Sequence, residues 1–415
     1  MRRLRSVVAA MSFALVAEVA LCQPLPLASR PEDVGFSSVR LERIRQRLHA
    51  DVDGGRIPGA VLLVARHGRI ASLQAVGFRQ RATRKPMTQD ALFRIASMTK
   101  PIVSVAIMAL AEEGRLDIGA PVAQYLPELE NVKVGVERVA PRRPMTVQDL
   151  LRHTSGLTYG IFGNSRVDEL YRSSEILRSA SLAQMVSAVA ALPLAHHPGE
   201  AWEYSVSTDV LGRIVEVVSG RELDAFIAER ITSPLKMPDT GFFAGAATLD
   251  RIALPDAEIA LPGPFPTSRP ALLSGGGGMV STAGDYARFS QMLLNGGELE
   301  GVRILSPKTV ELMTSDQIPP EAERHTSVAL LLDAFGPTPE MGSGFGLGFG
   351  VRTDPGRNPL PGSVGTFSWS GIAGTYFWAD PEEKLLAVVM TQIPQPALIP
   401  YWRQMRTLVY QAVMK

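Results

Sequence analysis

Residues 97–100 read SMTK and begin a stretch that continues to Glu113 with apolar residues at helical spacing. Gly114 marks its end, so the pattern predicts a helix with Ser97 at its start. On a helix, the side chains of Ser97 and Lys100 share one face, roughly 5–6 Å apart at Cβ. Because a serine hydroxyl is a weak nucleophile without an adjacent base, a neighbouring amine suits it to nucleophilic catalysis. The plainer alternative is an N-capping serine followed by a chance lysine.

A second stretch of the same spacing gives an internal comparison. Residues 233–236 read SPLK. They follow a helical stretch instead of beginning one, and they contain a proline that disfavours helix geometry. We therefore expect Ser233 and Lys236 to be loop residues.

Length and composition limit the classes of protein to which this chain can belong. The chain has 415 residues, 46% of them hydrophobic, with a formal net charge of +1. This length suits one large domain or two interlocked ones. Without a basic surplus, nucleic acid is not an expected partner, and neither is an electrostatic membrane anchor. Cys22 is the single cysteine, which excludes an intramolecular disulfide and a cysteine-based zinc site.

The N-terminus has the pattern of a signal peptide. Basic residues at positions 2, 3 and 5 precede an apolar run over 7–17 that is too short to span a bilayer. Small residues at Ala20 and Cys22 predict cleavage after Cys22, hence a periplasmic or secreted protein without stable membrane insertion. An uncleaved N-terminus of a cytoplasmic protein and a lipid anchor on Cys22 are the alternatives.

The two ends of the chain have similar patterns. A helix is expected over 37–53, followed by a hairpin of strands 61–65 and 70–76. Near the C-terminus, strands 375–379 and 385–391 precede a last helix over about 400–414. We infer an α+β fold in which both ends build one antiparallel sheet. The expected division is a signal peptide (1–22), a discontinuous sheet domain (23–110 and 290–415) and a mostly helical domain (111–289).

Several ordered motifs resemble those of the serine beta-lactamase and penicillin-binding superfamily. They are residues 93–100 (FRIASMTK), 150–157 (LLRHTSGL), 204–206 (YSV), 275–285 and 369–371 (WSG). The most similar branch is the class C-like one, which includes the family VIII carboxylesterases. The resemblance covers roughly residues 35–395, and it implies a beta-lactamase-like fold with the site in a cleft between the sheet and the helical domain.

The resemblance also implies roles for individual residues. Ser97 would be the nucleophile and Tyr204 the general base, with Lys100 lowering the phenol pKa. Whether Tyr204 or Lys100 accepts the serine proton first is left open. The amides of Ser97 and Ile372 would form an oxyanion hole. Neither a cofactor nor a metal ion is implied.

Two departures from the family pattern concern the substrate. Val206 stands where the beta-lactamases have an asparagine, and Trp369 stands where they have a lysine. A neutral, apolar wall in place of a cation favours uncharged esters. The expected substrate-binding residues are Trp369, Ser370, Gly371, Val206, Tyr159 and Phe162.

Other features have structural interpretations. The alternating glycines over 344–350 fit a strand and lack the spacing of a dinucleotide site. The Gly-x-Ser-x-Gly elbow of alpha/beta-hydrolases does not occur in the sequence. His153 is expected to be a packed residue, and His196 and His197 a loop pair.

The expected activity is two-step hydrolysis of short-chain neutral esters through an acyl-Ser97 intermediate. The rival within hydrolases is a beta-lactamase or DD-peptidase, with side activity on cephalosporins. An acyltransferase and an inactive protein that binds cell-wall peptides are the rivals from other classes. The sequence does not specify the oligomeric state.

Overall fold

The computed structural model describes residues 25–256, 263–332, 335–356, 358–393 and 398–414. The expected signal peptide lies outside these residues and stays a prediction. Within them, eight strands form one antiparallel sheet in the order β3-β2-β1-β12-β11-β10-β9-β8. These strands are β1 (Gly59–Arg66), β2 (Arg69–Gln80), β3 (Lys85–Pro86), β8 (Ser343–Phe345), β9 (Gly350–Arg352), β10 (Phe367–Ser370), β11 (Tyr376–Asp380) and β12 (Leu385–Thr391).

The central pair β1–β12 joins the two ends of the chain. Ala60 pairs with Thr391 and Arg66 with Leu385. Alternate side chains of both strands enter two different hydrophobic clusters. This period of two buries both faces of the sheet, as expected for strands covered on each side. The predicted sheet built from the two ends is confirmed.

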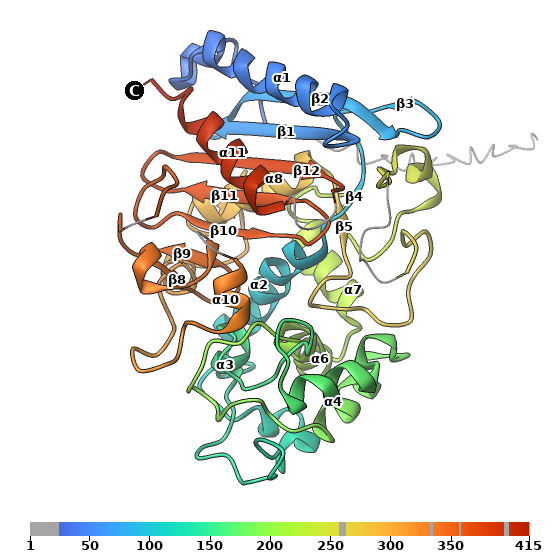
Figure 1. Ribbon diagram of the computed structural model, residues 1–415, viewed down its shortest axis with the longest axis vertical. Coiled ribbons are helices and arrows are strands. Elements are labelled where there is room, and N and C mark those ends of the chain that lie inside the picture. Colours follow the sequence, from blue (N-terminus) through green and yellow to red (C-terminus); the bar gives the residue numbers. More distant parts are fainter. Residues whose placement is uncertain (1–24, 257–262, 333–334, 357, 394–397, 415) are drawn as a thin grey trace, which may run out of the picture.

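Helices cover both faces of the sheet (Figure 1). On one face, α1 (Ser38–Asp53) and α11 (Leu398–Tyr410) pack through Ile44, Leu48, Trp402 and Met405. On the other face, α8 (Ala283–Leu294) contributes Tyr286 and Phe289. The Thr282 side chain caps α8 by accepting from the Asp285 amide.

The remaining elements lie mostly below the sheet in the orientation of Figure 1. The helices are α2 (Thr99–Glu112), α3 (Val147–Leu151), α4 (Arg166–Ser174), α5 (Leu182–Ala190), α6 (Ser207–Ser219), α7 (Leu223–Ile227), α9 (Pro307–Met313) and α10 (Ser327–Leu331). The short strands β4 (Phe93–Arg94) and β5 (Val280–Ser281) pair with each other, as do β6 (Glu298–Leu299) and β7 (Val302–Arg303). The expected domain boundaries stay a prediction.

Two elements differ from the sequence expectation. Helix α2 is buried at every residue from Thr99 to Leu110, where a single apolar stripe was expected. It runs between other helices, notably α6 and α7, which cover its remaining sides. The glycine-rich stretch 344–350 is not one strand, because β8 and β9 pair as a hairpin. Gly348 has a φ of 105° in the intervening turn, a backbone conformation that glycine adopts readily.

No helix among the described residues combines the length and apolarity needed to cross a membrane.

Candidate active site

A strained turn presents the candidate nucleophile. After β4, Ala96 adopts a φ of +44°, which is uncommon for a residue with a side chain. Ser97 lies in the short 3-10 turn Ala96–Met98, immediately before α2 begins at Thr99. Non-glycine residues in this region cost about 1–3 kcal/mol and persist where the surroundings fix them. Here the phenol of Tyr286 donates to the Met98 carbonyl at 2.9 Å, which ties the turn to α8.

Lys100 is fully buried, and its ammonium form has three oxygens to which it can donate. Its Nζ lies 2.7 Å from the Gly276 carbonyl, 3.0 Å from the Tyr159 hydroxyl and 3.4 Å from the Ser97 Oγ. Burial lowers the Lys100 pKa to about 7, against the opposing influence of Asp209. A large fraction of this amine is therefore neutral near pH 7, and its position next to Ser97 suits a proton acceptor.

The Tyr204 side chain packs against Lys100. Its hydroxyl accepts from the Trp369 Nε1 at 3.3 Å and is hydrogen-bonded to Ser97. The Lys100 Nζ lies 4.4 Å from the centre of its ring. The His153 ring packs against it with 4.8 Å between centroids. These contacts fix the phenol at the nucleophile.

The pKa of Tyr204 differs from the sequence expectation. Lys100 was expected to lower it, but burial raises the pKa well above its ordinary value of about 10, despite hydrogen bonds with Ser97 and Trp369. A phenol with a high pKa keeps its proton and is a poor initial base. The same burial that raises the pKa of Tyr204 lowers that of Lys100, because it disfavours the charged form of each group.

Asp209 organises the glycine loop, and sequence reasoning missed it. This buried carboxylate on α6 accepts from the Ser274 hydroxyl at 2.6 Å and from the Gly276 amide at 3.0 Å. A Cβ on Gly276 would lie 2.4 Å from the Asp209 Oδ2, so only glycine fits there. The contact holds the Gly276 carbonyl that accepts from Lys100. The only local sequence signal is the position of Asp209 in the first turn of the helix after Tyr204.

The WSG segment packs against the nucleophile turn. A Cβ on Gly371 would lie 2.3 Å from the Ile95 carbonyl, so this glycine lets β10 approach the backbone before Ser97. It was expected to approach the substrate. The Ile372 amide donates no hydrogen bond within the described part of the chain. Its availability fits the expected pairing with the Ser97 amide as an oxyanion hole.

The site opens into a cleft of about 590 Å³. Of the expected substrate-binding residues, Trp369, Ser370, Tyr159 and Phe162 line it. Val206 does not, because the chain enters α6 at this residue and its side chain is completely buried in the hydrophobic core. The expected substrate contact of Val206 is therefore not present in this structure.

Lys236, from the second Ser-x-x-Lys stretch, and His153 form their hydrogen bonds with residues other than Ser97 and Lys100. Lys236 Nζ donates to Glu300 Oε2 at 2.9 Å in an exposed ion pair, on the segment that follows a π-helical turn. His153 is buried, and its Nδ1 accepts from the Ser205 amide at 3.3 Å. Among the described residues, His, Cys, Asp and Glu side chains form no cluster of three or more that could hold a metal ion.

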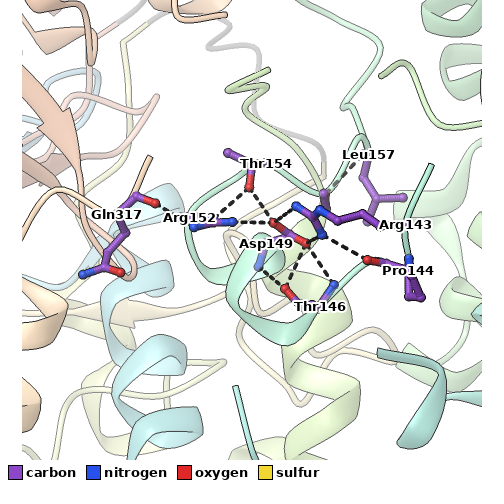
Figure 2. A network of polar contacts seen from close by, with 9 residues as sticks. Arg143, Pro144, Thr146, Asp149, Arg152, Thr154, Leu157 and Gln317 are labelled. Carbon is purple, nitrogen blue, oxygen red and sulfur yellow. Dashed lines mark hydrogen bonds and ion pairs between the residues drawn. The ribbon is translucent and has the colours of Figure 1, made fainter. Parts of the chain in front are cut away.

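The motif at residues 150–157 belongs to a structural network (Figure 2). Asp149 accepts from Arg143 at 2.6 Å and from Arg152 at 2.8 Å, and the Thr154 hydroxyl donates to it at 2.9 Å. Burial alone would raise its pKa, but hydrogen bonds from Arg143, Thr146 and Arg152 lower the pKa to about 2. The network fixes the loop that leads to Tyr159.

Comparison with known proteins identifies the family. The model of the Beta-lactamase family matches residues 44–408, and the chain belongs to this family. Protein Rv1367c of Mycobacterium tuberculosis is 38% identical, over 82% of this chain and 87% of its own length. Esterase EstB of Burkholderia gladioli is 33% identical, over 81% of this chain and 86% of its own.

A solved structure of a relative agrees with this assignment. EstCE1, described as a hydrolase with promiscuous acyltransferase activity, superposes with a TM-score of 0.75 at 29% identity. The match covers 90% of this chain and 99% of EstCE1. The protein is thus a serine hydrolase of the beta-lactamase fold with esterases among its relatives.

Proposed function

We propose that this protein is a carboxylesterase that cleaves neutral esters of short acyl chains through an acyl-Ser97 intermediate. One observation carries the proposal: the Ser97 hydroxyl lies between a buried lysine and a buried phenol at the base of a mostly apolar cleft. The kinship with Esterase EstB and EstCE1 supports it.

The proton transfers follow from the environments of the two partners. Neutral Lys100 accepts the proton of Ser97 as its oxygen attacks the ester carbonyl carbon. The amides of Ser97 and Ile372 hold the oxyanion of the tetrahedral intermediate. Tyr204 donates its proton to the departing alcohol, and the proton held on Lys100 restores the phenol. Water then attacks the acyl carbonyl carbon and gives up a proton to Lys100, while Tyr204 protonates the departing Ser97 oxygen. The proton held on Lys100 again restores the phenol as the acid leaves.

The cleft wall supports preference for a neutral substrate. Trp369 occupies the position at which the beta-lactamases have a lysine, and its indole donates to Tyr204. Two arginines also line the cleft: Arg178 is ion-paired with Glu175, and Arg94 donates to the Gly263 carbonyl at 2.9 Å. A carboxylate next to Trp369 would lose its water without gaining a cation there.

Paired assays with p-nitrophenyl butyrate and nitrocefin test the proposal. The wild-type protein should cleave the butyrate ester with a kcat/KM well above that for nitrocefin. Ser97→Ala should abolish ester cleavage, and Ser233→Ala, the matched control from the other Ser-x-x-Lys stretch, should cleave at the wild-type rate. Preference for nitrocefin would favour the beta-lactamase alternative, and an inactive Ser233→Ala would refute the site.

Acyl transfer is a second candidate, which the description of EstCE1 and the apolar cleft favour. In this reaction an alcohol replaces water in the attack on acyl-Ser97. Adding an alcohol acceptor to the butyrate assay should then yield a new ester and raise the rate of p-nitrophenol release. If the rate of p-nitrophenol release stays unchanged and butyrate is the sole acyl product, the reaction is hydrolysis.

A further inference from the structure

The cleft is larger and more apolar than short acyl chains require. Its volume of about 590 Å³ lies within the range of about 300–1,000 Å³ of pockets that enclose drug-sized ligands. Leucine and isoleucine side chains from three separate segments line it, namely Ile161, Leu177 and Leu331. These side chains are 59%, 41% and 55% exposed. Large apolar side chains gathered at the opening of one cleft indicate a surface that binds an apolar group.

The segment that leads into helix α10 is tied to the chain just before Tyr204. The hydroxyl of Thr326, its N-cap residue, donates to the Trp202 carbonyl at 2.9 Å, and the Trp202 amide donates to Glu323 at 2.9 Å. The segment that leads into α10 is therefore tied to the backbone two residues before Tyr204. The α10 side chain Leu331 lines the same cleft as the Tyr204 side chain.

The position of the proton donor decides which half of the ester lies beside α10. In the proposed mechanism Tyr204 protonates the departing alcohol, so the alcohol must lie next to the phenol. A short acyl chain fills only a small part of the cleft, which leaves the space towards α10 for the alcohol. This step rests on the proposed function.

We propose that the substrate is an ester of a bulky, apolar alcohol and that Leu331, with Leu177 and Ile161, determines specificity for that alcohol. Each apolar contact made in the transition state raises kcat/KM, and a ring-sized alcohol can reach several such side chains at once.

A series of butyrate esters of primary alcohols tests the proposal, because their leaving groups have similar chemistry. Ethyl, cyclohexylmethyl and adamantylmethyl butyrate increase only in apolar bulk. For the wild-type protein, kcat/KM should rise along the series by at least roughly tenfold. Leu331→Asp should reduce the adamantylmethyl-to-ethyl ratio by at least roughly tenfold, because it places a charge against the apolar group.

Leu330 provides the matched control. It is 59% exposed on the same helix and does not line the cleft. Leu330→Asp should keep the wild-type ratio. A wild-type kcat/KM that stays constant along the ester series would overturn the proposal. Equal reductions of the adamantylmethyl-to-ethyl ratio in Leu331→Asp and Leu330→Asp would also overturn it, because they would indicate a general apolar surface such as one that contacts lipid. A Leu331→Asp effect confined to acyl length, measured with p-nitrophenyl butyrate and decanoate, would also overturn it.

A binding measurement separates this proposal from the proposed function. Ser97→Ala should bind adamantylmethyl butyrate more tightly than ethyl butyrate, and adding Leu331→Asp to that variant should remove the difference. This result does not require turnover. Failure of the wild-type protein to cleave p-nitrophenyl butyrate would contradict the proposed function, whereas equal binding of the two esters would contradict the present inference.

Discussion

Tyr159→Phe removes one of the three oxygens to which Lys100 donates. The substitution keeps the ring and deletes the hydroxyl that lies 3.0 Å from the Lys100 Nζ. The remaining two acceptors are the Gly276 carbonyl and the Ser97 Oγ. Because the lost hydrogen bond stabilises the ammonium form more than the neutral amine, the variant should have a lower Lys100 pKa.

The size of the shift follows from hydrogen-bond energies. A hydrogen bond to a charged group contributes about 1.5–3 kcal/mol, and one to a neutral group about 0.5–1.5 kcal/mol. The difference is about 1–1.5 kcal/mol, and one pKa unit corresponds to about 1.4 kcal/mol. From its value of about 7 in the wild-type protein, the Lys100 pKa should fall by about one unit.

The pH dependence of kcat/KM for p-nitrophenyl butyrate measures this shift. Since neutral Lys100 is the proposed base, wild-type activity should rise with pH through about 7. In Tyr159→Phe the midpoint of this rise should move about one unit towards lower pH. Tyr171→Phe is the control, because it removes a buried hydroxyl that has no partner among the described residues. A midpoint that stays in place in Tyr159→Phe, or activity that falls with pH through 7, would refute the reasoning.

Three further predictions concern other parts of the molecule. Tyr204→Phe should lower kcat by at least roughly 10²-fold, because it removes the proton donor and keeps the ring; wild-type turnover would leave Lys100 as the sole proton carrier. The wild-type protein should prefer p-nitrophenyl butyrate to benzylpenicillin by at least roughly 10³-fold in kcat/KM, and Trp369→Lys should narrow this gap. Efficient wild-type penicillin cleavage would instead assign carboxylate binding to Arg94. Asp149→Asn should lower the urea-unfolding free energy at pH 7 by at least about 2 kcal/mol, since it removes the buried carboxylate that pairs with Arg152 and with the half-buried Arg143, while exposed Glu169→Gln should change it by less than about 0.5 kcal/mol. Because the Asp149 pKa is about 2 when folded and about 3.9 when unfolded, its contribution of about 2–3 kcal/mol should be complete above pH 4 and lost as the pH falls towards 2.

Local patterns were sufficient to predict the main elements of the fold. The strands around residues 61–76 and 375–391 were recognisable as apolar runs on either side of a turn, and helix α1 presents one apolar stripe. The Thr282 cap of α8 is a local feature of the same kind, since a capping residue and its partner lie three positions apart. Burial of α2 on all sides was less evident, because the covering helices α6 and α7 follow more than ninety residues later in the chain.

The partners of Lys100 were only partly predictable. Ser97 is three residues away, so helical spacing suffices. The Gly276 carbonyl and the Asp209 carboxylate come from distant segments, and a backbone carbonyl has no signature in the sequence. The pKa of Tyr204 was expected in the wrong direction, because the sequence shows the neighbouring cation but not the depth of burial.

The most direct test of the central claim is covalent labelling with diisopropyl fluorophosphate, followed by peptide mapping. The proposed mechanism predicts one phosphoryl group per chain, located on Ser97, and loss of esterase activity in proportion to labelling. Ser97→Ala should remain unlabelled under the same conditions, and Ser233→Ala should be labelled as the wild-type protein is. A label on Ser233 or another residue, or full inhibition without a label on Ser97, would contradict Ser97 as the nucleophile.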